Sequence, residues 1–179
     1  AFVADEAEAR AAKRGMWSVA AAAAPLHARQ DLPDQTFGAA TVVDGNTLRI
    51  AGAELRLYGI DAPELFQSCL YGSWNYSCGT QSRAELIRMT LGKNVFCARE
   101  EVTGDTRAFA RCWEANATGD GPAENATSFN KTMVEKGWAL ADRKVSEEFR
   151  ALELEATRNK VGMHVGERVR PTSWRRGHR

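Results

Sequence analysis

Two cysteines placed symmetrically about a turn signal constrain the fold more than any other feature of the sequence. Cys97 and Cys112 are equally distant from Gly104-Asp105, and glycine at the first turn position suits a two-residue type II′ hairpin. Directly opposed residues of an antiparallel pair lie about 4.5–5.5 Å apart at Cα, within the range of a disulfide. A longer loop keeps this register if it stays symmetric. The sequence therefore predicts strands over 95–99 and 108–114, bridged by Cys97 and Cys112.

A second pair of cysteines indicates a second bridge. Cys69 and Cys78 bracket a short loop, and the spacings of the four cysteines fit no CxxC metal pattern. Two disulfides would place the protein in an oxidising compartment, either secreted or periplasmic. The alternative, four reduced and buried cysteines in a cytosolic protein, stays open.

The order of the remaining elements predicts the fold class. Residues 39–50 and 53–60 are rich in β-forming residues, with a tight-turn signal at Asp44-Gly45. Helices are expected over 80–91, over 128–136, and from an N-cap at Ser146 to Gly162. Strands followed by helices that pack on a small closed sheet predict an α+β fold with a barrel.

The first 36 residues are expected to form a separate arm. Residues 3–15 are rich in helix formers, and an alanine- and proline-containing linker follows over 18–36. Residues 6–17 also echo residues 153–164. The echo is either a coincidence or a sign that residues 1–17 copy the closing helix, as the remnant of a preceding domain or as an arm that docks on a neighbour. The predicted organisation is an arm over 1–36, with possible self-association, and a domain over 37–179.

Two motifs carry a resemblance to a known family. The turn Asp44-Gly45-Asn46-Thr47 is followed by Arg56-Leu57-Tyr58-Gly59-Ile60-Asp61-Ala62-Pro63-Glu64. This pattern resembles the staphylococcal nuclease family, which has a DGDT turn and an R-x-(apolar)-D-x-P-E strand end, and the resemblance covers roughly residues 40–175. It implies an OB-fold, a five-stranded β-barrel with about three packed helices, that hydrolyses DNA and RNA, usually with calcium.

The resemblance also implies roles for individual residues. Arg56 and Arg111 match the two catalytic arginines, Glu64 matches the catalytic glutamate, and Asp61 matches a calcium-binding aspartate. The chemistry agrees with these roles. A guanidinium binds two phosphate oxygens at once and stays charged, and a carboxylate such as Glu64 can accept a proton from the attacking water.

The sequence departs from the family pattern in three places. Asn46 stands where the second turn carboxylate is expected, so Asp44, Asn46 and Asp61 would form only a weak calcium site. The stretch before the second arginine reads Arg107-Ala108-Phe109-Ala110-Arg111, without the acid and the glycine of the family. Residues 141–145 replace the base-stacking tyrosines. We therefore expect either no required cofactor or weakly bound Ca²⁺.

The predicted function is a nuclease that cuts RNA and/or DNA with weak or no calcium dependence. RNA should be cut at least as well as DNA, because its 2′-OH is an intramolecular nucleophile. The alternatives are a catalytically impaired OB-fold module that binds nucleic acid and, less favoured, an interaction protein built around the arm. Retention of Arg56, Asp61, Glu64 and Arg111 together favours the enzyme.

The remaining features bear on partners. The net charge of +1 gives no information about them, and no apolar run is long enough to predict a membrane span. The arginine-rich residues 166–179 would either touch phosphates or extend into solvent. Trp74, Trp113 and Trp138 are expected to serve in packing more than in base stacking.

Overall fold

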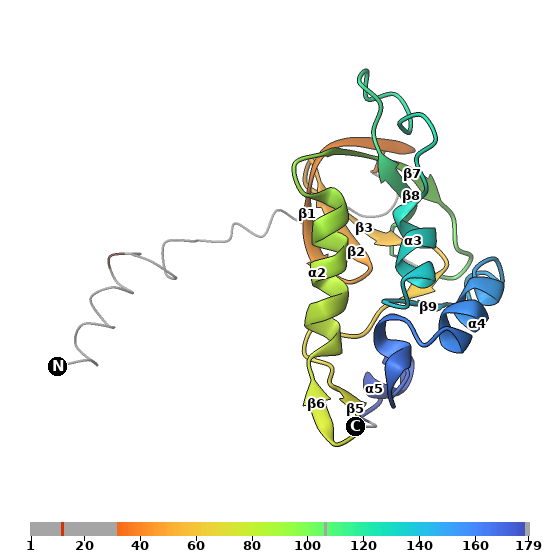
Figure 1. Cartoon of the computed structure of the whole chain (residues 1–179). Helices are drawn as coiled ribbons and strands as arrows, with labels where there is room; N and C mark the ends of the chain where they lie inside the picture. Colours follow the sequence, from red (N-terminus) through yellow and green to blue (C-terminus); the bar gives the residue numbers. More distant parts are fainter. Residues whose placement is uncertain (1–11, 13–31, 106, 178–179) are drawn as a thin grey trace.

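Five strands form a closed barrel. The computed structural model describes residue 12, residues 32–105 and residues 107–177 (Figure 1). The strand order around the barrel is β1-β2-β3-β8-β7. The strands are β1 (Gln35–Asp44), β2 (Thr47–Ile50), β3 (Ala53–Leu57), β7 (Asn94–Glu100) and β8 (Phe109–Glu114). Only the β3–β8 pair is parallel. The predicted α+β class and OB-fold barrel are confirmed.

The helices pack around this barrel. They are α2 (Cys78–Thr90), α3 (Phe129–Glu135), α4 (Arg150–Arg158), the 3-10 helix η3 (Gly162–Val165) and α5 (Pro171–Trp174). Helix α2 packs along β1, whereas α3 lies between β8 and α4 (Figure 1). The prediction of an N-cap at Ser146 was wrong. Its hydroxyl accepts from the backbone N–H of Glu148 in a turn, and the helix begins at Arg150.

Two small sheets lie outside the barrel. The first pairs β4 (Ile60–Asp61) with β9 (Leu140–Ala141), which ties the chain after β3 to the chain after α3. The second is a hairpin of β5 (Cys69–Tyr71) and β6 (Trp74–Tyr76). Trp74 and Tyr71 face each other in this hairpin and are 77% and 60% exposed. The expectation that Trp74 packs against the protein was therefore wrong.

Both predicted disulfides are present, and no cysteine is free. Cys97 pairs directly with Cys112 across β7 and β8, with their Cα atoms 4.1 Å apart. The predicted register is correct, but the two-residue turn is wrong. The loop extends over 101–108 and stays symmetric, which preserves the register.

A buried asparagine fixes helix α3 to the barrel. Asn130 is fully buried and accepts a hydrogen bond from the backbone N–H of Cys112 at 3.1 Å. Its amide donates to the carbonyl oxygens of Tyr58 at 2.9 Å and Ala110 at 3.1 Å. Because Tyr58 follows β3 and Ala110 belongs to β8, this one side chain holds together the two parallel strands that lead to the site.

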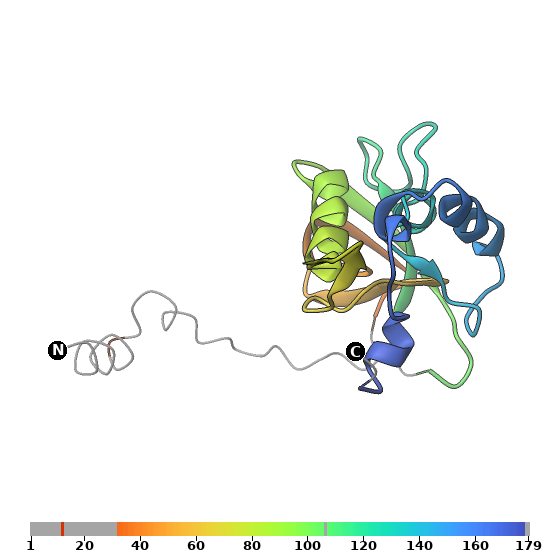
Figure 2. The ribbon, with the colours of Figure 1, turned by 60° about the horizontal axis from the view of Figure 1, so that its bottom comes forward.

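The C-terminal segment, residues 166–177, is docked on the domain, so the expectation of a tail that extends into solvent was wrong, whereas contact with phosphates stays a prediction. It crosses the molecule from η3 to α5 (Figure 2). Glu167 bridges to Leu70 of β5, and Arg170 pairs with the buried Glu153 at 3.2 Å. The predicted helix over 3–15 lies outside the described residues, as does the linker up to residue 31. No helix among the described residues has the length and apolar character needed to span a membrane.

Candidate active site

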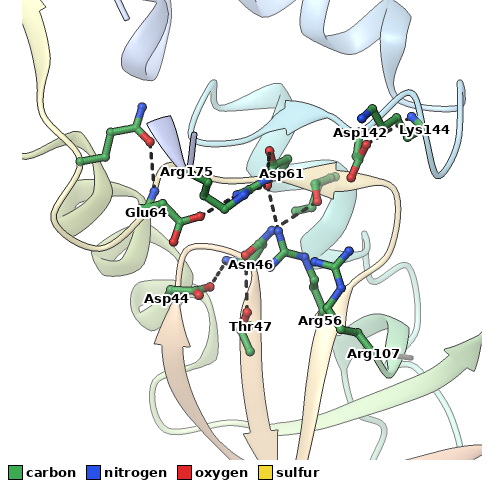
Figure 3. Close-up of polar contacts among 12 residues, drawn as sticks. Asp44, Asn46, Thr47, Arg56, Asp61, Glu64, Arg107, Asp142, Lys144 and Arg175 are labelled. Atoms are coloured by element: carbon green, nitrogen blue, oxygen red, sulfur yellow. Dashed lines mark hydrogen bonds and ion pairs between the residues drawn. The ribbon is translucent and has the colours of Figure 1, made fainter. Parts of the chain in front are cut away.

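Arg56 and Asp61 form the centre of a polar cluster where β3 leaves the barrel. The Nη2 atom of Arg56 donates to Oδ1 of Asp61 at 2.9 Å (Figure 3). Both side chains are largely buried, at 16% and 5% exposed. The Nε atom of Arg56 is buried without a hydrogen-bond partner among the described residues. An unsatisfied donor of this kind costs about 1–3 kcal/mol, and the oxygen of a bound anion would relieve that cost.

Glu64 lies beside this pair and is held from both its side chain and its backbone. Its Oε1 accepts from Nη1 of Arg175 at 2.6 Å. Its backbone N–H donates to Oε1 of the fully buried Gln67 at 3.2 Å, and its carbonyl oxygen accepts from the N–H of Gln67 at 2.7 Å. Gly79 of α2 packs so closely that an added Cβ would lie 1.7 Å from the carbonyl oxygen of Glu64. The carboxylate is thus presented from a fixed backbone.

Arg107 is a second arginine of the site, and the sequence analysis did not select it. Arg56 pairs with Phe109 across the parallel strands β3 and β8, and Arg107 precedes Phe109 by two residues. The guanidinium of Arg107 stacks on the Phe109 ring at 5.1 Å. In Figure 3 its side chain lies next to that of Arg56, from the chain just before β8.

Charges in the cluster support this placement of Arg107. Its hydrogen bonds with Asp105 raise the pKa of Arg107. The charge of Asp142 also raises this pKa, and the charge of Arg175 lowers it. The pKa of Asp105 falls to about 2, first because of the hydrogen bonds from Arg107, and Arg56 contributes. Arg56 and Arg107 therefore both act on Asp105, and Arg175 lies within electrostatic reach of Arg107.

Arg111, the predicted second catalytic arginine, is bound elsewhere. Its Nε donates to Glu100 at 2.6 Å, and its two terminal nitrogens donate to Glu148 at 2.7 and 2.6 Å. Its guanidinium also lies over the Tyr58 ring at 4.9 Å. The hydrogen bonds that Arg111 donates to Glu148 and Glu100 raise the pKa of Arg111 above its ordinary value. The structure thus brings Arg56, Asp61 and Glu64 together but leaves Arg111 outside their contacts.

Asp44 and Asn46 form the turn between β1 and β2. Oδ1 of Asp44 accepts from the backbone N–H of Asn46 at 2.9 Å. Asn46 is buried, its amide donates to the carbonyl oxygen of Ile60 at 3.3 Å, and its own carbonyl oxygen accepts from the N–H of Leu57. The turn is therefore tied to both β3 and β4.

These residues do not fit a calcium ion. Calcium takes six to eight oxygen ligands, several of them carboxylates. Both oxygens of Asp61 are occupied by guanidinium groups, and Asn46 turns its NH₂ toward Ile60. No group of three histidine, cysteine or acidic side chains with metal-binding geometry occurs among the described residues. Of the predicted set, Asp44 accepts from the backbone of Asn46, the amide of Asn46 donates to Ile60, and Asp61 is bound by Arg56 and Arg175.

The fold and the site together define an OB-fold protein with an arginine–carboxylate cluster of the kind that binds phosphate. The sequence model of the staphylococcal nuclease homologue family matches residues 54–164, which is more than half of the chain. The chain belongs to this family.

A curated relative shares part of the sequence. The succinoglycan biosynthesis protein ExoI of Rhizobium meliloti (strain 1021) is 43% identical over 51 residues. The aligned segment covers 28% of this chain and 27% of that protein. The chain thus matches only about a quarter of the length of this relative.

Proposed function

We propose that this protein is a phosphodiesterase that hydrolyses RNA and/or DNA. Arg56 and Arg107 bind the scissile phosphate, and Glu64 accepts the proton of the nucleophile. The observation that carries the proposal is that Arg56 of β3 and Arg107, from the chain just before β8, lie side by side near an anchored glutamate. Family membership supports the same reaction class.

The geometry suits an in-line displacement at phosphorus. A guanidinium donates to two phosphate oxygens and remains charged as negative charge accumulates in the transition state. Oε2 of Glu64 makes no hydrogen bond within the described residues, and the side chain is 38% exposed. Oε2 can therefore take a proton while the new P–O bond forms, and the bond from phosphorus to the leaving sugar oxygen breaks.

The proposal separates Arg107 from Arg111. We expect Arg56→Ala and Arg107→Ala each to lower kcat by about 10²-fold or more, since each removes a preorganised donor worth about 2.7 kcal/mol or more. Arg111→Ala serves as the matched control. It should keep kcat within about threefold, because Arg111 is neutralised by two glutamates away from the cluster.

Turnover of single-stranded DNA and RNA oligonucleotides by the three variants, with circular dichroism as a folding check, is the measurement. A large loss in Arg111→Ala with normal Arg107→Ala would restore the role first expected for Arg111.

The alternative is an OB-fold module that binds nucleic acid without cutting it. Asn46 in place of a turn carboxylate favours this alternative. Tight binding of an oligonucleotide by the wild type, with no product after prolonged incubation in EDTA or in calcium, would establish it.

We further propose a secreted or periplasmic location. Both disulfides are buried in the fold, and such bridges persist in oxidising compartments. Isolation of the protein from its source with both bridges intact would support this location.

A further inference from the structure

Arg175 of the C-terminal segment lies between the two carboxylates of the site. Its Nη1 and Nη2 atoms donate to Oδ1 and Oδ2 of Asp61 at 3.1 and 3.0 Å. The same Nη1 donates to Oε1 of Glu64 at 2.6 Å (Figure 3). One guanidinium therefore joins a buried carboxylate to an accessible one, across more than 100 residues of sequence.

The main chain delivers this guanidinium in a defined position. Glu167 is paired with Leu70, and the carbonyl oxygen of Val169 accepts from Nε2 of Gln67 at 2.7 Å. Pro171 then begins α5, and the N–H of Arg175 donates to the carbonyl oxygen of Pro171 at 3.0 Å. Gln67 thus contacts both the backbone of Glu64 and the segment that carries Arg175.

Arg175 uses the oxygens that a divalent cation would need. A metal ion at this point would take Asp61 as a ligand and would draw on Glu64. With Arg175 in place, both oxygens of Asp61 and one oxygen of Glu64 already have a cationic partner. The guanidinium and a metal ion would therefore compete for these carboxylates.

We propose that Arg175 is a built-in cation that takes the place of a divalent metal and positions Glu64 for the reaction. This inference rests on the proposed function for its catalytic part alone. Arg175 holds Oε1 of Glu64 and leaves Oε2 to the nucleophile, and it neutralises Asp61, which would otherwise repel the phosphate. A lysine would supply the charge but not the two parallel hydrogen bonds to Asp61.

Binding of calcium alone tests the exclusion without reference to turnover. Isothermal titration of the full chain with CaCl₂ compares the wild type, Arg175→Ala and Arg176→Ala. Arg176→Ala is the matched control, because this substitution removes the same charge from the same segment. Arg176 forms no ion pair within the described residues. We expect Arg175→Ala to bind calcium at least about tenfold tighter than the other two proteins. Equal affinities, or tight binding by the wild type, would overturn the exclusion.

Turnover tests the positioning role. In EDTA, Arg175→Ala should lose at least about 30-fold in kcat with little change in KM, whereas Arg176→Ala and the wild type should differ by less than about threefold. Millimolar guanidinium or calcium should restore part of the lost rate, and Arg175→Lys should lie between the wild type and Arg175→Ala.

Two results would contradict the positioning role. Faster turnover by Arg175→Ala than by the wild type would make Arg175 an inhibitor of the site, and a loss that neither cation restores would make it merely structural. Absence of turnover in every protein, the wild type included, would refute the proposed function, while the calcium titration would still decide the exclusion.

Discussion

At the residue scale, Asn46 departs from the family motif and makes a contact that only an amide can make. Its amide donates to the carbonyl oxygen of Ile60, the first residue of β4. An aspartate side chain at this position has no N–H to donate. Its carboxylate would therefore face the carbonyl oxygen of Ile60 in a buried place, without a hydrogen bond, which is unfavourable. Asn46 therefore stabilises the arrangement in which Asp61 is free to bind guanidinium groups.

The residues of the site differ in how far the sequence could predict them. Arg56, Asp61 and Glu64 lie within one short stretch, so local geometry alone brings them together. Arg111 lies in β8, and Arg107 lies two residues before β8 begins. Because an even number of positions separates them, the alternation of side chains cannot distinguish them, and only the roughly 13 Å that four extended residues span does. Arg175 meets Asp61 through the docking of a distant segment, which no local pattern encodes.

His164 provides a residue-scale prediction about pH. It is buried in η3, where Nδ1 lies 2.8 Å from the hydroxyl of Thr157 and Nε2 has no partner among the described residues. Burial, and to a smaller extent the charge of Arg168, lower the pKa of His164 from 6.5 to about 4, while Glu153 opposes this shift. The unfolded chain therefore binds more protons between these two pH values, and stability falls as pH drops through that window.

We expect this histidine to remove about 2 kcal/mol from the free energy of unfolding at pH 5, relative to pH above 7. Urea titrations of the wild type and His164→Gln at pH 7.5, 6 and 5 measure the effect. The variant should lose much less stability over this range, because the carboxylates with lowered pKa values titrate below it. Parallel curves for the two proteins would rule out His164 as the cause.

At the element scale, the β5–β6 hairpin connects a disulfide to the site. Cys69 starts β5 and Cys78 starts α2. The segment between Glu64 and this bridge contains Gln67, which holds both Glu64 and Val169. The sequence predicted this bridge from the short loop. It could not predict that Gln67 holds the C-terminal segment, because Gln67 and Val169 lie more than 100 residues apart in the chain.

The two disulfides are therefore expected to differ in their effect on activity. Replacing Cys69 and Cys78 by alanine should lower kcat by about tenfold or more, because Gln67 and the C-terminal segment lose their support. Replacing Cys97 and Cys112 should leave kcat within about threefold. Each double variant should lose about 2–4 kcal/mol of stability.

Activity is measured at a temperature at which both variants remain folded, as judged by circular dichroism. Equal losses of kcat in the two variants would show that the bridge at Cys69 has no specific connection to the site.

Aromatic side chains are exposed on the same hairpin and at Phe66, which follows Glu64 by two residues. Phe66 is 86% exposed, and Trp74 and Tyr71 project from the facing strands. Base stacking on an exposed aromatic contributes about 1–3 kcal/mol. Trp74→Ala should therefore raise the KM for single-stranded oligonucleotides by about fivefold or more, with little change in kcat.

Leu91 is a suitable control for this measurement, because it is similarly exposed, at 74%, but lies at the end of α2. An equal rise of KM in Leu91→Ala would attribute the effect to general surface changes and not to stacking.

At the scale of the whole molecule, the sequence predicted the architecture well. The order of strands and helices and the symmetric cysteines indicated an α+β barrel, and the motif resemblance indicated the OB-fold. The docked C-terminal segment was not predicted, because its arginines looked like a solvated tail when their partners, Glu153, Asp61 and Glu64, were unknown. Docking and self-association of residues 1–17 stay predictions.

The choice between RNA and DNA belongs to this scale, since it depends on how the whole substrate lies in the site. We expect RNA to be cut at least as fast as DNA in EDTA. Its 2′-OH lies beside the phosphorus, and a well-oriented internal nucleophile reaches an effective molarity of about 10⁵ M or more. Glu64 would accept the proton of that hydroxyl.

Matched RNA and DNA strands, and a strand with one 2′-deoxynucleotide, measure this preference. Cleavage should be slowest at the deoxynucleotide, and the RNA products should carry 2′,3′-cyclic phosphates. DNA cut about tenfold faster than RNA would show that external water is the preferred nucleophile.

The link from the Cys69–Cys78 bridge through Gln67 to Arg175 has a consequence for when the protein can cut. The cysteine variants test whether the bridge supports the site. If it does, Glu64 is less firmly positioned in a chain whose thiols are still reduced. Newly made protein in a reducing interior would then cut the nucleic acid of its own cell about tenfold more slowly, or slower still. Oxidation of the thiols would raise the activity, so the covalent bond that stabilises the fold would also delay cleavage until after synthesis.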